Sequence, residues 1–122
     1  MVKMNNHKKI NYLEFPATDI EATKTFFTDV FAWSFVDYGP DYVAFSDAGI
    51  EGGFAKSDIA ATTANGSVLV VLYSKQLKQT QSDIETAGGL IIKPIYSFPG
   101  GYRFHFTDPN GNEFSVWSEL DQ

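Results

Sequence analysis

Hydrophobic and polar residues alternate along several short segments of this chain, and this alternation predicts β-strands. In residues 10–16, INYLEFP, Leu13 and Phe15 point to one face of the expected strand, while Tyr12 and Glu14 point to the other. Further strands are predicted, in chain order, at residues 33–38, 42–46, 50–56, 67–73 and 90–97. The chain is therefore expected to consist largely of short strands.

Two segments have apolar residues at helical spacing instead. The sequence TDIE is a capping-box pattern in which Thr18 and Glu21 satisfy each other's backbone amides, so a helix is expected to begin there. An apolar stripe follows it: Ala22, Phe26, Phe27, Val30 and Phe31. A second helix is predicted at residues 75–87, before a pair of glycines that can cap it. The order strand, helix, strand, strand, strand thus occurs twice, which indicates an internal duplication.

The strongest local signal is a β-hairpin at residues 102–119, YRFHFTDPNGNEFSVWSE. Pro109 presets the first turn position, and Asn110 and Gly111 adopt positive φ at little cost. Two aromatic-rich runs flank this turn. They are therefore expected to pair as antiparallel strands.

The length of the hairpin loop decides which side chains share a face of the sheet. With a four-residue loop, Asp108 pairs with Glu113, and we expect this register. It places four side chains on one face: Phe104, Phe106, Ser115 and Trp117. A shift of one residue would instead place Arg103 and His105 beside Ser115 and Trp117.

The whole chain is expected to form one α+β domain made of two βαβββ modules. Its 122 residues are 43% hydrophobic, which suffices for one packed core. The modules are expected at residues 10–56 and 67–119 of a domain spanning 10–120, with a small, polar linker at 57–66 and a flexible tail at 1–9.

Composition excludes several classes of partner. Fifteen acidic and nine basic residues give a formal charge of −6, which disfavours nucleic acid and anionic lipid surfaces. The sequence has neither a signal peptide nor an apolar run of the roughly 20 residues that a membrane span needs. The absence of cysteine removes disulfides and thiolate metal sites, which fits a cytoplasmic protein.

Two segments of the chain, INYLEFPATDIEATKTFFTDVFAWSF and FTDPNGNEFSVW, resemble the glyoxalase/bleomycin-resistance proteins of the vicinal oxygen chelate superfamily. The resemblance covers nearly the whole chain. It implies two modules whose sheets curl into an open cup, usually within a homodimer. In the metalloenzymes of this superfamily, four positions on the cup face hold a divalent metal for isomerase, dioxygenase, epimerase or thiol-transfer chemistry.

The four metal positions implied by this resemblance carry unsuitable residues here. They fall on Tyr12, Gly53, Leu69 and Ser115, with Glu51 as the nearest carboxylate to the second position. Metals in such sites need imidazole, carboxylate or amide oxygen at fixed geometry, and a phenol is a poor ligand for zinc or nickel. We therefore expect no metal ligands and no cofactor.

The alternation and the expected hairpin register together predict the lining of the cup: Tyr12, Glu14, Phe104, Phe106, Ser115 and Trp117. In this register His105 faces away and is a structural histidine, while Arg103 could bind a carboxylate or form part of a solvated face. The leading hypothesis is metal-independent binding of a small aromatic or cationic molecule. The alternatives are a metal-dependent lyase or dioxygenase with an atypical ligand set, and a non-catalytic scaffold or regulatory module. Catalysis itself stays open.

Overall fold

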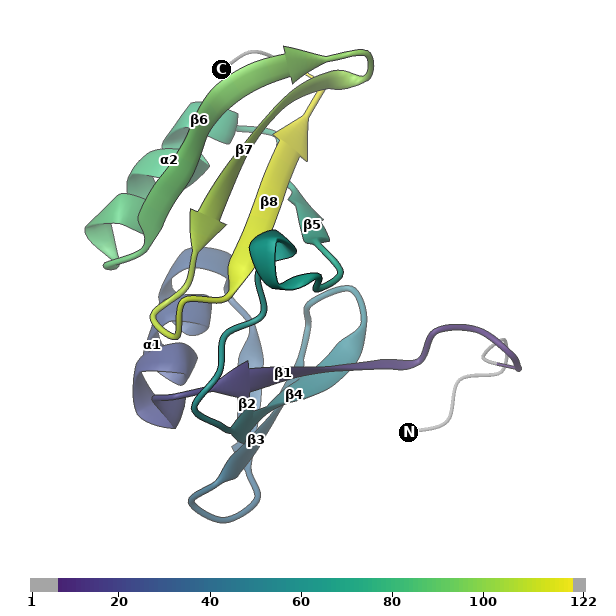
Figure 1. Cartoon of the computed structure of the whole chain (residues 1–122), viewed down its shortest axis with the longest axis vertical. Coiled ribbons are helices and arrows are strands. Elements are labelled where there is room, and N and C mark those ends of the chain that lie inside the picture. Colours follow the sequence, from purple (N-terminus) through teal and green to yellow (C-terminus); the bar gives the residue numbers. More distant parts are fainter. Residues whose placement is uncertain (1–6, 120–122) are drawn as a thin grey trace.

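The computed structural model describes residues 7–119, arranged as an α+β fold of two modules (Figure 1). The first module contains β1 (Tyr12–Ala17), α1 (Ile20–Phe31), β2 (Ser34–Asp37), β3 (Tyr42–Ser46) and β4 (Glu51–Lys56). The second contains β5 (Val70–Tyr73), α2 (Leu77–Thr86), β6 (Leu90–Phe98), β7 (Gly101–Thr107) and β8 (Glu113–Ser118), after a short 3-10 helix, η1 (Thr63–Asn65). The predicted fold class and the repeated βαβββ order are confirmed. Most of the tail expected at 1–9, and the domain end expected at 120, lie outside the described residues.

Each module forms one four-stranded mixed sheet, and the two sheets have equivalent topologies. Their strand orders are β1-β4-β3-β2 and β5-β8-β7-β6. In both, the first strand runs parallel to the last strand of its module, and the other neighbours are antiparallel. Figure 1 shows the sheets one above the other, with both helices behind them in this view. Each sheet therefore has one face packed on an α-helix and one face that neither α-helix covers, although η1 lies over the start of β8.

Helix α1 packs against both sheets and supplies the centre of the core. Phe27 lies 5.5 Å between ring centroids from Phe54 of β4 and 5.4 Å from Phe114 of β8. One turn away, Phe31 stacks on Phe106 of β7 at 6.0 Å. The apolar stripe of α1 thus joins the modules into one hydrophobic core.

Helix α1 begins one residue later than the predicted capping box implies. Asp19 is the N-cap, and its carboxylate accepts a hydrogen bond from the Ala22 amide at 3.0 Å. Glu21 forms an ion pair with Lys24 at 3.0 Å instead of reaching back to a backbone amide. The reason is a long-range contact, because the Asp19 amide donates to the side chain of Asn110 at 3.0 Å.

The DPNGN turn connects the second module to the first. Asn112, with none of its surface exposed, donates to the carbonyl of Pro16 at 2.7 Å and accepts from the Ala61 amide at 2.8 Å. Asn110 donates to the hydroxyl of Thr23 in α1 at 2.7 Å. The turn therefore contacts strand β1, helix α1 and the linker.

Asp108 holds these two amide side chains in place. Its carboxylate accepts hydrogen bonds from the backbone amides of Asn110 and Asn112, both at 2.9 Å. Burial raises the pKa of Asp108 to about 6, although the hydrogen bonds from Asn112 and Asn110 act in the opposite direction. The same carboxylate thus organises the turn from inside the protein.

The predicted hairpin register is wrong by one residue. Thr107, not Asp108, pairs with Glu113, so the loop spans residues 108–112. Asp108 and Asn112 close this loop with a hydrogen bond from the Asp108 amide to the Asn112 carbonyl at 3.0 Å. The long-range contacts of Asn112 hold it in the loop, which adds one residue to the predicted four.

The corrected register moves Phe104 and Phe106 to the helix-covered face. They pair with Val116 and Phe114 and have no exposed surface. Arg103 and His105 take the opposite face, beside Trp117 and Ser115. This register buries Phe104 and Phe106 in place of Arg103 and His105. It is favoured because the two phenylalanines complete the core beneath α1.

Candidate functional site

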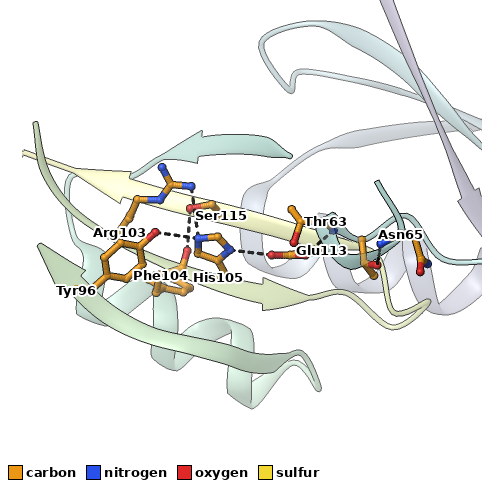
Figure 2. Close-up of polar contacts among 9 residues, drawn as sticks. Thr63, Asn65, Tyr96, Arg103, Phe104, His105, Glu113 and Ser115 are labelled. Atoms are coloured by element: carbon orange, nitrogen blue, oxygen red, sulfur yellow. Dashed lines mark hydrogen bonds and ion pairs between the residues drawn. The ribbon is translucent and has the colours of Figure 1, made fainter. Parts of the chain in front are cut away.

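Polar side chains gather on the uncovered face of the second sheet. Arg103 and His105 come from β7, and Glu113, Ser115 and Trp117 come from β8. Successive residues of a strand point to opposite faces, so these positions share one face of the hairpin. Figure 2 shows the polar members of this group along the two strands. We call the five residues the second-sheet face.

His105 lies at the centre of a hydrogen-bonded row. Its Nδ1 is 2.8 Å from Oε2 of Glu113, so Nδ1 carries the hydrogen that the carboxylate accepts. Its Nε2 lies 3.0 Å from the hydroxyl of Tyr96 on β6 and 3.4 Å from Nη2 of Arg103. With Nδ1 protonated, a neutral ring presents Nε2 as an acceptor to both. The row therefore runs from Glu113 through His105 to Tyr96 and Arg103 (Figure 2).

Glu113 is fixed by the linker as well as by His105. Its Oε1 accepts from both the backbone amide and the hydroxyl of Thr63 in η1, each at 2.8 Å. Burial acts to raise the pKa of Glu113, but the hydrogen bonds from His105 and Thr63 outweigh it and hold this pKa below its ordinary value. The carboxylate is thus ionised at neutral pH, and both of its oxygens accept hydrogen bonds within the protein.

A shallow apolar pocket lies at the other end of the same face. It has a volume of about 300 Å³ and is lined by Val71, Phe98, Gly100, Arg103 and Trp117. The indole of Trp117 meets Phe98 edge to face at 6.1 Å and Tyr73 at 5.1 Å. We call this hollow the Trp117 pocket. It combines aromatic walls with one cation, a composition typical of small-molecule sites.

The uncovered face of the first sheet carries a pair of phenols. The hydroxyls of Tyr12 and Tyr42 are 2.5 Å apart, and both lie over Gly53. A Cβ at Gly53 would come within 2.1 Å of the Tyr42 oxygen and 2.9 Å of the Tyr12 oxygen. Burial and the contact with Tyr12 raise the pKa of Tyr42. These phenols therefore occupy the space above the middle of β4.

The six residues predicted for the cup do not gather at one place within the chain. Tyr12 and Glu14 lie on the first sheet, and Glu14 lines a separate hollow of about 530 Å³ beside the linker. Ser115 and Trp117 share the second-sheet face, as expected. The other two predicted members, Phe104 and Phe106, belong to the core, because the hairpin register differs from the prediction.

The residues at the implied metal positions do not fit a metal. The phenol of Tyr12 is bonded to Tyr42, and Gly53 beneath them has no side chain. Leu69 offers no donor, and the buried hydroxyl of Ser115 donates to the carbonyl of Phe104 at 2.9 Å. Among residues 7–119, no three His, Cys, Asp or Glu side chains form a group that could hold a metal ion.

Sequence reasoning missed the row around His105 because it rested on the wrong register. The alternative register did place Arg103 and His105 on this face, so the signal was present in the alternation. Two partners could not be found in this way. Tyr96 comes from a strand with irregular pairing, and Thr63 comes from the linker.

Comparisons with solved structures show the same fold. The chain is similar to a glyoxalase-related enzyme from Fulvimarina pelagi, with a TM-score of 0.76, 15% identity, and coverage of 91% of this chain and 88% of that one. It is similar to the fosfomycin resistance protein FosX from Listeria monocytogenes, with a TM-score of 0.75, 16% identity, and coverage of 93% and 94%. It is also similar to a lactoylglutathione lyase from Agrobacterium tumefaciens, with a TM-score of 0.67, 19% identity, and coverage of 91% and 93%.

Sequence comparisons identify the family. No curated protein matches the chain in sequence. No helix within residues 7–119 is both long and apolar enough to cross a membrane. Residues 9–116 match the family model, which spans both βαβββ modules. The chain therefore belongs to the Glyoxalase/Bleomycin resistance protein/Dioxygenase superfamily.

Proposed function

We propose that this protein binds a small aromatic molecule on the second-sheet face and that it does so without a metal. The observation that carries this proposal is the Trp117 pocket, where aromatic walls adjoin a fixed polar row. An aromatic ligand would bury apolar surface against Trp117 and Phe98. The polar row could then orient its polar substituents.

The proposed independence from metal follows from the donor set. Three of the four implied ligand positions carry no group that binds Zn, Ni or Mn well: Gly53, Leu69 and Ser115. The fourth, Tyr12, is held in a hydrogen bond to Tyr42. The unprotonated Nε2 of His105 faces the Tyr96 hydroxyl and the guanidinium of Arg103, whose positive charge opposes a metal cation there.

Removing the indole of Trp117 should abolish ligand binding at a small cost in stability. Trp117 is only half-buried and lies on the face opposite the core, so Trp117→Ala should leave the core packing intact. A panel of uncharged and charged fused-ring aromatics, added to protein dialysed against EDTA, should raise the melting temperature of the parent and not of this variant.

Tyr38→Ala provides the matched control, because Tyr38 is an aromatic that is 65% exposed and lies far along the chain from the pocket. This control should keep the ligand response of the parent protein. A response that disappears in EDTA, or stoichiometric metal after dialysis, would contradict metal-independent binding. No response to any aromatic would remove the proposed function.

We also propose that two copies of the chain associate. Strand β5 forms one edge of the second sheet, and two apolar residues there are exposed: Val68, just before the strand, at 83%, and Val71, within it, at 44%. Ile10, just before edge strand β1, is 76% exposed. Unpaired edges with apolar side chains favour pairing with another chain. A second copy would also supply a facing layer for the uncovered sheets.

Sedimentation equilibrium at micromolar concentration should give twice the chain mass of 13.6 kDa. Val68→Asp should shift the protein toward the single-chain mass, because a charge at the sheet edge opposes pairing. Tyr38→Asp is the control, since Tyr38 is 65% exposed between β2 and β3, across the first sheet from edge strand β1. A parent protein that sediments at the single-chain mass would contradict the association.

A further inference from the structure

Among residues 7–119, no carboxylate forms an ion pair with Arg103, since the ion pairs involve Lys24 and His105. The Nε of Arg103 is buried and has no hydrogen-bond acceptor. Its polar contact with the described residues is the 3.4 Å approach of Nη2 to His105. A guanidinium has five N–H donors, so most of its hydrogen-bonding capacity is unused.

The surroundings of Arg103 hold the guanidinium while leaving its donors available. It lies 5.8 Å from the ring centroid of Phe98 and 5.9 Å from that of Tyr96, within range for cation–π attraction. Such contacts involve the faces of the rings and leave the N–H groups at the edge of the guanidinium free. Arg103 also lines the Trp117 pocket. Its free donors therefore border an apolar hollow.

Two carboxylates lie at the ends of β8, Glu113 and Glu119, and both are hydrogen-bonded to other groups. Glu119, two residues beyond Trp117, accepts from the hydroxyl of Tyr73. Glu113 accepts three hydrogen bonds, one from His105 and two from Thr63, on the far side of the His105 ring from Arg103. A second cation, Lys93 of β6, lies 4.3 Å from the ring centroid of Tyr96. Arg103 thus places a positive charge in the lining of the pocket itself, although the whole chain carries a formal charge of −6.

We propose that the Trp117 pocket selects aromatic carboxylates, with Arg103 binding the carboxylate and Trp117 and Phe98 contacting the ring. This inference rests on the proposed function and names its ligand class. A planar carboxylate matches the paired N–H donors of a guanidinium, and Arg103 lines the pocket in which the ring would lie. The pocket of about 300 Å³ accommodates a one- or two-ring acid. A cationic ligand is disfavoured there, because it would meet the charge of Arg103.

Three probes of one shape test this inference: naphthoate, naphthamide and naphthylmethylamine, which are anionic, neutral and cationic. Titrations are followed through the indole N–H resonance of Trp117, with that of the buried Trp33 as an internal reference. Naphthoate should bind the parent protein about tenfold more tightly than naphthamide, because hydrogen bonds to a charged group are the stronger ones. Naphthylmethylamine should bind more weakly than either.

Arg103→Gln should reduce the preference for naphthoate over naphthamide to about twofold or less, while the amide still binds. Lys93→Gln removes the same unit charge from a residue outside the pocket lining and should preserve the preference. Binding of all three probes with equal affinity, or a preference that survives Arg103→Gln, would overturn the assignment of Arg103 and leave the aromatic pocket standing. Failure of every probe to shift Trp117 would overturn the pocket together with its selectivity.

Discussion

Phe114→Ala is expected to destabilise the protein by about 3 to 5 kcal/mol, the largest effect of any single substitution considered. Phe114 has no exposed surface and joins three elements through its ring. Its centroid lies 5.2 Å from Phe15 of β1, 5.4 Å from Phe27 of α1 and 5.4 Å from Phe106 of β7. Removing it leaves a cavity at the place where the modules meet.

Urea unfolding followed by far-ultraviolet circular dichroism would measure this loss. Trp117→Ala is a matched control on the same strand, because it removes a larger ring from the opposite, uncovered face. The control should lose less than half as much stability as Phe114→Ala. Equal losses, or a loss of less than about 1 kcal/mol for Phe114→Ala, would show that the core is not continuous between the modules.

Asn112→Ala is expected to cost about 2 to 4 kcal/mol, although it removes only a short polar side chain. The substitution leaves the Pro16 carbonyl and the Ala61 amide without partners inside the protein. It also removes a donor to the carboxylate of Asp108 at 3.4 Å. Buried polar groups that lose their partners retain the full cost of leaving water, so the loss exceeds that of an ordinary hydrogen bond.

Asn65→Ala is the corresponding control in the same urea experiment. Asn65 is exposed, and its side-chain amide donates to the carbonyl of Ala60 at 3.1 Å. Water can replace that contact, so the control should lose less than about 1 kcal/mol. If Asn112→Ala were as mild as Asn65→Ala, the turn would not be holding the two modules together.

Local patterns were sufficient to predict the elements of this fold. Alternation in β1 correctly placed Tyr12 and Glu14 opposite Leu13 and Phe15, and helical spacing identified the buried stripe of α1. These features depend on residues within one or two turns of each other. Residues that are close in sequence are therefore sufficient to predict them.

Features that depend on contacts between distant residues could not be predicted from local patterns. The hairpin loop contains five residues because Asn112 is bound to Pro16 and Ala61, 96 and 51 positions away. Asn110 likewise bonds the Asp19 amide at the start of α1, 91 positions away. Because the loop has one residue more than predicted, Arg103 and His105 lie on the uncovered face where Phe104 and Phe106 were expected. That face therefore carries a cation and an imidazole in place of two aromatic rings.

The contacts of the DPNGN turn also determine when this protein can finish folding during its synthesis. The aromatic face of α1 has a partner in its own module, Phe54, but Phe31 and the amide of Asp19 are also contacted by Phe106 and Asn110, the latter 91 positions from Asp19. A ribosome shields the most recently added residues, so these partners become available only after the first module has emerged. The first module therefore emerges with this part of its apolar surface uncovered, and a chain that terminates before Asn110 would leave that part exposed.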